Sequence, residues 1–262
     1  LGILRNPAVN VLRRGRNDLQ MTPEILAFLR EPQTLIITKA NVKSLVHRRV
    51  HMDYVGVKIF DASGKVAGEL RIVGLLTATA YNDPVTSVPY IRRKAEYVFD
   101  KAGYPRDSYS ARGLTNVLES YPRDELFQIA PEQLEGFARD IMALADRPRL
   151  RALARVDRFD RFVSLLVYVP KDRYDSEVRR KIGLWLAQVY SGRVSAAYPS
   201  YPEGPLSRTH FIIGRDEGQT PHISRPDLEE GIAAIVRTWG DQLREAAIGN
   251  PAAAKLIARY AD

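Results

Sequence analysis

The order of strand-like and helix-like stretches is the feature that most limits how this 262-residue chain can fold. Residues 34–76 are rich in β-branched and alternating apolar residues, whereas residues 88–145 carry apolar residues at helical spacing. From about residue 150, short strand-like and helix-like patterns alternate along the sequence. Segregated strands and helices are typical of α+β proteins. The sequence therefore predicts an α+β fold with a small antiparallel sheet near its start.

Three strands are expected in the first part of the chain, at residues 34–38, 53–60 and 66–76. The turn signal Asp61–Gly64 joins the last two as a hairpin. Before the strands, Thr22 is the expected N-cap of a helix that has Pro23 at its first position.

Helix start and stop signals divide the next stretch of about 60 residues. The predicted helices cover residues 88–102, 111–120, 123–128 and 131–145. Gly103 ends the first helix, and Ser110 is the expected N-cap of the second.

The second half repeats short strands and helices in a recognisable order. The predicted elements are strands at 150–156 and 162–169, a helix capped by Asp172 or Asp175 that runs to about Tyr190, strands at 193–201 and 206–214, and a helix at 226–248. This β-β-α-β-β-α order predicts an open sheet with helices on one face, as in ferredoxin-like and ACT-type folds.

Length and composition predict two domains with flanking segments. The expected parts are an N-terminal helical segment at 1–33, an α/β domain at 34–147 with a helical part from about 88, a second domain at 148–248, and the start of another helical segment at 249–262. The chain begins at Leu1 rather than Met and stops within an Ala-rich helical pattern. We therefore expect it to be a piece of a longer polypeptide.

Composition excludes several classes of protein. The chain has no cysteine, which rules out disulfides, thiolate zinc sites and a cysteine nucleophile. Its net charge of +8 is spread along the chain in short clusters, which favours solvated surfaces over a nucleic-acid footprint. The sequence contains no run of about 18 apolar residues, so no membrane-spanning helix is predicted.

The candidate chemical groups are weak as catalytic centres. His47 and His51 have i, i+4 spacing but lead into a strand, so a hydrogen-bonded loop pair is favoured over a metal site. The acidic residues of Arg123–Glu125 suit a helix N-terminus, and the alternating charges of Asp157–Arg161 suit a hairpin turn. No dinucleotide or phosphate fingerprint lies between a strand and a helix. We therefore predict no catalytic, cofactor-binding or metal-binding residues in this chain.

Three ordered stretches of sequence resemble the large bacterial NAD-specific glutamate dehydrogenases. They are Thr38–Asn41 with Ser44, Val46–Arg48 and Met52–Lys58, then Tyr121–Phe127, and then Arg155–Ser164 continuing through Val169–Tyr174. The resemblance covers roughly residues 34–175, and the remainder fits the family in the order of its elements.

The resemblance implies that the chain belongs to the non-catalytic N-terminal regulatory segment of such an enzyme, with a PAS-like unit at 34–147 and an ACT-like unit at 148–248. The parent enzyme would convert L-glutamate, water and NAD into 2-oxoglutarate, ammonium and NADH, while this piece would hold no cofactor. The implied partners are the remaining domains of the same polypeptide, further copies in a homo-oligomer and a possible amino-acid effector, in the cytoplasm and without nucleic acid or membrane. A stand-alone small-molecule sensor built from the same two folds is the alternative.

The resemblance also points to one loop as a candidate ligand or interface site. ACT domains that bind amino acids typically have a glycine between their first strand and first helix, where the backbone approaches the ligand. The corresponding loop here, 170–176, has no glycine. The candidate residues are Lys171, Asp172, Arg173 and Tyr174. An architectural unit that packs against other segments is at least as consistent with this loop as a ligand-binding one.

Overall fold

The computed structural model describes residues 2–5, 33–46, 49–215, 218–238, 240–241 and 247. The chain divides into two compact units. The first comprises Leu1–Arg147, Asp157–Arg161 and Asp216–Gly218, and the second comprises Pro148–Val156, Phe162–Arg215 and Gln219–Asp262. The helix expected from Thr22 and the segment at 249–262 lie outside the described residues, and a short 3-10 helix, η1 (Gly2–Arg5), precedes them.

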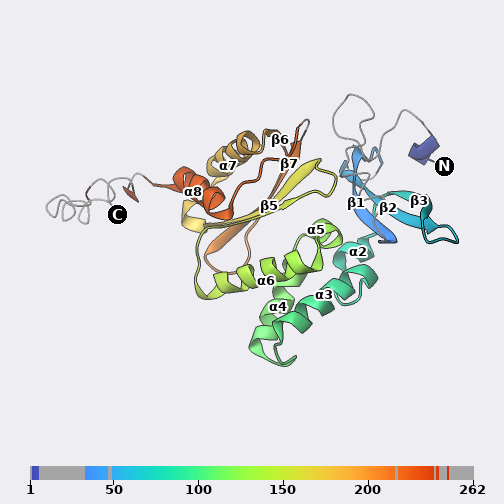
Figure 1. Ribbon diagram of the computed structural model, residues 1–262. Coiled ribbons are helices and arrows are strands. Elements are labelled where there is room, and N and C mark those ends of the chain that lie inside the picture. Colours follow the sequence, from blue (N-terminus) through green and yellow to red (C-terminus); the bar gives the residue numbers. More distant parts are fainter. Residues whose placement is uncertain are drawn as a thin grey trace. The chain divides into compact units, whose positions relative to one another are not determined.

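The first unit begins with a three-stranded antiparallel sheet, which confirms the predicted sheet (Figure 1). Its strands are β1 (Leu35–Lys43), β2 (His51–Phe60) and β3 (Val66–Gly74), in the order β1-β2-β3. β1 extends five residues past the predicted end at Thr38, because Lys39 pairs with Asp53 and Lys43 with His51. Pairing with a neighbouring strand overrides the weak strand propensity of those residues.

One face of this sheet, here called the inner face, packs into a small core. Ile36, Ala40 and Tyr54 point to the inner face and are buried against Phe159. Phe159 comes from the turn Asp157–Arg161, which belongs to the first unit although it lies far along the sequence. The turn thus supplies the apolar side chain that covers the inner face.

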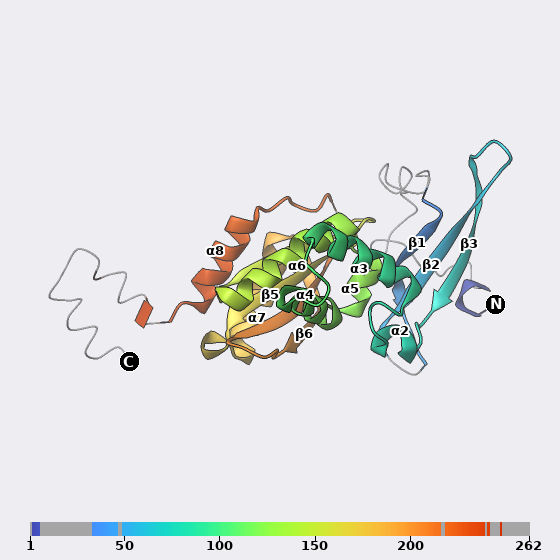
Figure 2. The same cartoon turned by 90° about the horizontal axis from the view of Figure 1, so that it is seen from below.

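Helices complete the first unit (Figure 2). They are α2 (Ala78–Asn82), α3 (Pro89–Ala102), α4 (Tyr109–Ser120), α5 (Arg123–Gln128) and α6 (Pro131–Asp146). Gly103 ends α3 in the left-handed conformation with φ 64°, as predicted. The N-cap of α4 is Ser108 rather than Ser110, because the Ser108 hydroxyl accepts a hydrogen bond from the Ala111 amide. The helix therefore begins at Tyr109, before the predicted start at residue 111.

A buried lysine ties α3 to the end of α5. The Lys94 ammonium donates to the carbonyl oxygens of Leu126, Phe127 and Ile129 at 2.8, 3.0 and 2.7 Å. These carbonyls lie at the C-terminal end of α5, where a positive charge is favourable. α3 also packs against α6, so Lys94 fixes the meeting point of three helices.

The second unit is a four-stranded antiparallel sheet with two helices on one face, as predicted. Its elements are β4 (Arg151–Val156), β5 (Phe162–Pro170), η2 (Lys171–Arg173), α7 (Ser176–Val189), β6 (Gly192–Ser200), β7 (Leu206–Arg215) and α8 (Arg225–Val236). The strand order is β4-β5-β7-β6. Leu165 of β5 and Phe211 of β7 are fully buried in one core with Ile182 of α7 and Ile232 of α8.

The last predicted helix is interrupted, which corrects the expected span of 226–248. α8 ends at Val236, and Arg237 has an extended backbone with ψ 129°. The Thr238 hydroxyl then accepts a hydrogen bond from the Asp241 amide and donates to the Asp241 carboxylate. These local hydrogen bonds compete with continuation of the helix that periodicity alone favours.

Candidate functional site

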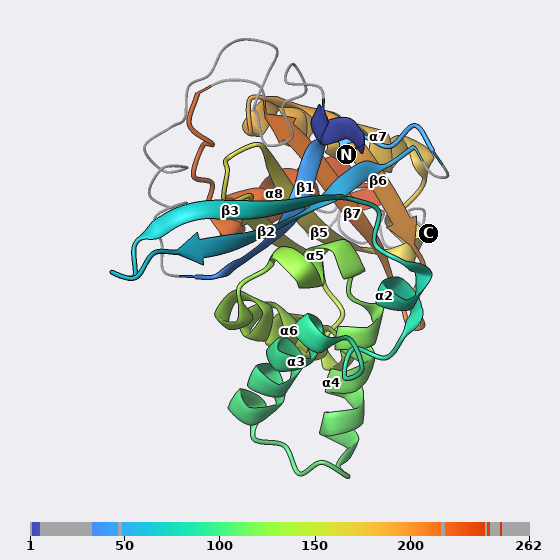
Figure 3. The same cartoon turned by 90° about the vertical axis from the view of Figure 1, so that its right-hand side faces the viewer.

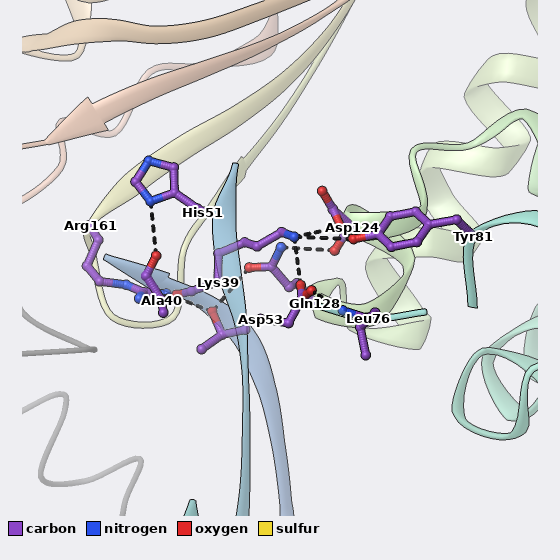
Figure 4. A network of polar contacts seen from close by, with 10 residues as sticks. Lys39, Ala40, His51, Asp53, Leu76, Tyr81, Asp124, Gln128 and Arg161 are labelled. Carbon is purple, nitrogen blue, oxygen red and sulfur yellow. Dashed lines mark hydrogen bonds and ion pairs between the residues drawn. The ribbon is translucent and has the colours of Figure 1, made fainter. Parts of the chain in front are cut away.

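A cluster of polar side chains in the first unit surrounds Lys39 (Figure 4). The Lys39 ammonium lies 2.6 Å from Asp53 Oδ1 on β2 and 2.9 Å from Asp124 Oδ1 on α5. The Tyr81 hydroxyl of α2 donates to the same Asp124 oxygen at 2.7 Å. Asp53 Oδ2 also accepts a hydrogen bond from the Leu76 amide. The cluster therefore joins the sheet to α2 and α5.

Electrostatics keep Lys39 charged. Burial alone would lower its pKa, but the negative charges of Asp124 and Asp53 outweigh burial and raise the pKa above its ordinary value. Burial, reinforced by Asp124, raises the pKa of Tyr81 to about 12. A lysine that acts as a nucleophile or base needs a lowered pKa. The arrangement suits a permanent ion pair rather than lysine chemistry.

A second part of the network lies on the inner face of β1. The Thr38 hydroxyl donates to Gln128 Oε1 of α5 at 3.1 Å, and Arg161 Nη2 donates to Thr38 Oγ1 at 2.7 Å. Arg161 also contacts the Lys39 carbonyl oxygen. Gln128 in turn donates to the Asp124 carbonyl at 2.9 Å. The two parts therefore form one continuous network around β1.

The turn Asp157–Arg161 holds that arginine in place. Asp157 Oδ2 accepts hydrogen bonds from the amides of Phe159 and Arg161, as expected for turn chemistry. It also forms a buried ion pair with Arg161, with an Nε–Oδ2 distance of 2.7 Å. Sequence reasoning missed that Arg161 reaches β1. The signal available was that both segments belong to the ordered stretches that resemble one family.

The loop that was predicted as a ligand or interface site makes contacts within its own unit. Lys171 Nζ donates to the Pro202 carbonyl at 2.7 Å, and Arg173 Nη1 lies 2.9 Å from Asp241 Oδ2. The Tyr174 hydroxyl is hydrogen-bonded to Thr209 Oγ1. Asp172 is the exposed member of the four predicted residues. The structure thus brings these residues onto one loop, where three of them bind neighbouring parts of the same unit.

The N-terminus of α7, which follows this loop, carries its own negative charges. Asp175 is the N-cap, and its carboxylate accepts a hydrogen bond from the Val178 amide at 2.7 Å. Glu177 stands in the first turn. These carboxylates occupy the favourable positive end of the helix, which disfavours an added anion there.

Of the predicted histidine loop pair, only His51 lies among the described residues. His51 is the first residue of β2, and its Nδ1 lies 3.0 Å from the Ala40 carbonyl oxygen, while His47 lies outside the described residues. Burial lowers the pKa of His51. Among the residues that the structure describes, no group of three histidine or acidic side chains is arranged to hold a metal ion.

Two domain families of known proteins match this chain. Residues 88–147 match the family described as glutamate dehydrogenase, helical motif 1, and residues 151–240 match glutamate dehydrogenase, ACT2 domain. Together the two matches cover more than half of the chain. The chain belongs to the glutamate dehydrogenase family.

Three relatives share the name NAD-specific glutamate dehydrogenase. The protein of Halomonas elongata is 34% identical over 268 residues, which cover 100% of this chain and 16% of that protein. The protein of Pseudomonas aeruginosa is 34% identical over 247 residues, 94% of this chain and 15% of that protein. The protein of Mycobacterium tuberculosis is 28% identical over 229 residues, 83% and 14% respectively. The chain thus spans about one-sixth of the first two relatives.

The family assignment confirms the resemblance and the ACT-like fold of the second unit. The match to helical motif 1 corresponds to α3–α6, and the match to the ACT2 domain corresponds to β4–α8. In the described part of the chain, no helix is long and apolar enough to span a bilayer.

The ACT2 domain also contains a serine–histidine pair that sequence reasoning missed. Ser164 Oγ of β5 lies 2.8 Å from His210 Nε2 of β7, and the two residues are close in register across the sheet. Both side chains are buried. The pair satisfies two buried polar groups, and its burial keeps the hydroxyl from acting as an exposed nucleophile.

Proposed function

We propose that this chain is a non-catalytic regulatory and assembly part of an NAD-dependent glutamate dehydrogenase. The observation that carries the proposal is the pair of domain matches, helical motif 1 and ACT2, in a chain that spans 16% of a relative. The parent reaction would convert L-glutamate, NAD and water into 2-oxoglutarate, ammonium and NADH. NAD would bind elsewhere in the parent enzyme.

The geometry of the polar clusters supports a structural role for their residues. Lys39 lies between the carboxylates of Asp53 and Asp124. Arg161 donates hydrogen bonds to both carboxylate oxygens of Asp157. Both cations therefore connect segments of the fold. Lys94 also connects two segments, through hydrogen bonds to three backbone carbonyl oxygens at the end of α5. Breaking such a pair by removing one partner leaves an uncompensated buried charge, and groups held in this way are poorly suited to proton transfer.

The proposed organisation retains the parts expected from the sequence. These are a helical segment at 1–33, a PAS-like domain at 34–147, an ACT-like domain at 148–248 and a further helical segment at 249–262. The partners would be the remaining domains of the same cytoplasmic polypeptide and further copies in a homo-oligomer.

The loop at 170–176 is proposed to bind amino acids weakly or not at all. Lys171 and Arg173, the cations that would attract a carboxylate, bind Pro202 and Asp241 instead. Calorimetric titration of the chain with L-glutamate and other amino acids should give no heat above dilution. Micromolar binding would contradict this part of the proposal and would favour the alternative of a small-molecule sensor.

Binding of NAD tests the non-catalytic role. We expect equilibrium dialysis of the purified chain against about 1 mM NAD to show no retention of NAD. This concentration is roughly the upper end of the usual range of KM values of enzymes. Saturable binding to one site per chain would contradict the proposal.

A further inference from the structure

β3 is an edge strand of the three-stranded sheet formed by the described strands (Figure 3). Its nine residues, Val66–Gly74, contain neither proline nor lysine, and the pairing with β2 runs without a shift from Gly68 to Gly74. Among the described strands, β2 is its single neighbour. Natural edge strands are usually short or protected by proline, lysine or a bulge. The one register shift of this strand pair lies at its far end, between Ile59 and Phe60 of β2. The seven residues from Gly68 to Gly74 are therefore a regular edge without proline or lysine, which is suited to pairing with another strand.

Apolar side chains cover the face of the sheet next to this edge, here called the outer face. Register places Leu70 of β3 beside Val57, and Ile72 beside Val55. Leu70 and Ile72 are each 56% exposed. Ile59 of β2 lies on the same face and is 53% exposed. The outer face is therefore a continuous aliphatic surface that ends at the open edge.

The opposite, inner face of β3 carries a pair of opposite charges. Glu69 Oε2 accepts a hydrogen bond from Arg71 Nε at 2.9 Å, and Glu69 Oε1 accepts one from the Tyr54 hydroxyl at 2.5 Å. Arg71 remains about half exposed. One acid and one base therefore stand symmetrically on either side of Leu70.

That symmetry selects one register for pairing with an identical strand. If two β3 strands run antiparallel and cross at Leu70, Glu69 lies opposite Arg71 of the partner subunit, and Leu70 lies opposite its own copy. If the register shifts by two residues in one direction, Arg71 lies opposite its own copy. If it shifts by two residues in the other direction, Glu69 lies opposite its own copy. Both arrangements are unfavourable because like charges then face each other. A shift by one residue turns the apolar face of one strand toward the polar face of the other.

We propose that a second copy of this chain pairs with the first through β3, antiparallel and centred on Leu70. The contact joins two three-stranded sheets into one six-stranded sheet with a continuous outer face. It is isologous, as closed two-fold dimers require. The inference deepens the proposed assembly role and rests on it. Because one strand pair is small beside the about 1,200–2,000 Å² of stable interfaces, the dimer should depend on protein concentration.

Single cysteines provide a test of the register, because the chain contains no cysteine. Two copies of Leu70 directly opposite each other would have Cα atoms about 4.5–5.5 Å apart, within the range of a disulfide. Two copies of Ile72 would be separated by four residues along the strands, roughly 13 Å. Leu70→Cys and Ile72→Cys are matched variants, because both side chains are 56% exposed on one face of one strand.

The measurement is the rate of disulfide-linked dimer formation by each full chain under mild oxidation, together with sedimentation velocity over a range of concentrations. We expect Leu70→Cys to cross-link at least about tenfold faster than Ile72→Cys. Adding Arg71→Glu, which places two acids opposite each other, should reduce cross-linking of Leu70→Cys about tenfold. Leu184→Cys, on an exposed position of α7, is the control for random collision.

Equal rates for Leu70→Cys and Ile72→Cys, or sedimentation as a monomer at every concentration, would overturn the inference. The inference would also be overturned if dimers persisted after Arg71→Glu and Leu184→Cys cross-linked fastest. That result would place the contact between the two copies away from β3. Cross-linking requires no dehydrogenase activity and no NAD, so its failure is distinguishable from failure of the proposed function.

Discussion

Asp157 binds Arg161 through both carboxylate oxygens, at 2.7 and 3.0 Å, and both side chains are almost completely buried. The pair orients the guanidinium toward Thr38 on β1, which lies 123 positions away in the sequence. The turn Asp157–Arg161, which the local sequence predicts only as a polar hairpin turn, is therefore hydrogen-bonded to the first sheet.

Removing the acid should destabilise the first unit. Asp157→Ala leaves a buried guanidinium without its counter-charge, and we expect a loss of about 3–5 kcal/mol in the free energy of unfolding. Equilibrium urea unfolding followed by circular dichroism measures this loss. Asp172→Ala, at an exposed carboxylate, is the control and should change stability by less than about 0.5 kcal/mol. Equal effects of the two variants would show that the buried pair contributes little.

Two glycines on helices should respond to alanine in opposite directions. A Cβ at Gly231 of α8 would lie 2.0 Å from Trp185 Cζ2, whereas a Cβ at Gly136 of α6 would meet nothing within 4 Å. Gly231→Ala should cost about 1–3 kcal/mol through overpacking. Gly136→Ala should stabilise by about 0.5–1 kcal/mol through helix propensity. Thermal unfolding of both variants measures the difference, and a stabilising Gly231→Ala would contradict the packing of Trp185.

Lys94 should be more important for stability than an exposed lysine on the same helix. Lys94→Met leaves the Leu126, Phe127 and Ile129 carbonyls without their donor, and we expect a loss of about 2–4 kcal/mol. Lys101→Met, in the last turn of α3, should change stability by less than about 0.5 kcal/mol. Hydrogen exchange of the α5 amides should also accelerate in Lys94→Met alone. Unchanged exchange would contradict the capping role.

The pH dependence of stability should include a contribution from His51. Burial lowers its pKa in the folded chain, so the unfolded state binds the proton first as the pH falls. The contribution is fully present above the ordinary histidine pKa of about 6.5 and is lost as the pH falls below it, by at most about 1.4 kcal/mol per pH unit. His51→Asn should flatten the unfolding free energy between about pH 7 and 5. An unchanged slope would contradict it.

Local signals accounted for most of the helices and strands. Arg123–Gln128 was predicted as a helix from its acidic first turn, and α5 has those bounds. The β-β-α-β-β-α succession of the second unit was predicted from the alternation of short strands and helices, whereas its spatial strand order, β4-β5-β7-β6, was not. The sequence did not predict that β1 extends to Lys43, because those residues become a strand only through pairing with β2.

The polar network could not be predicted from local pattern. Lys39 and Asp124, or Thr38 and Arg161, are separated by 85 or more positions, and their pairing depends on tertiary packing. Each charged residue had a sufficient local explanation, such as a helix start for Asp124 and a turn for Arg161. The end of α8 at Val236 was missed for a related reason, because the Thr238–Asp241 hydrogen bonds compete with a helical apolar pattern.

Turnover by the purified chain tests directly whether it is a non-catalytic part of the parent enzyme. L-Glutamate and NAD are supplied in excess, and NADH formation is followed by its absorbance beside an equimolar amount of the full-length Pseudomonas aeruginosa relative. If the chain is a regulatory and assembly part, its rate should equal the rate without protein while the relative produces NADH. Glutamate-dependent NADH formation by the chain alone, proportional to its concentration, would contradict the account.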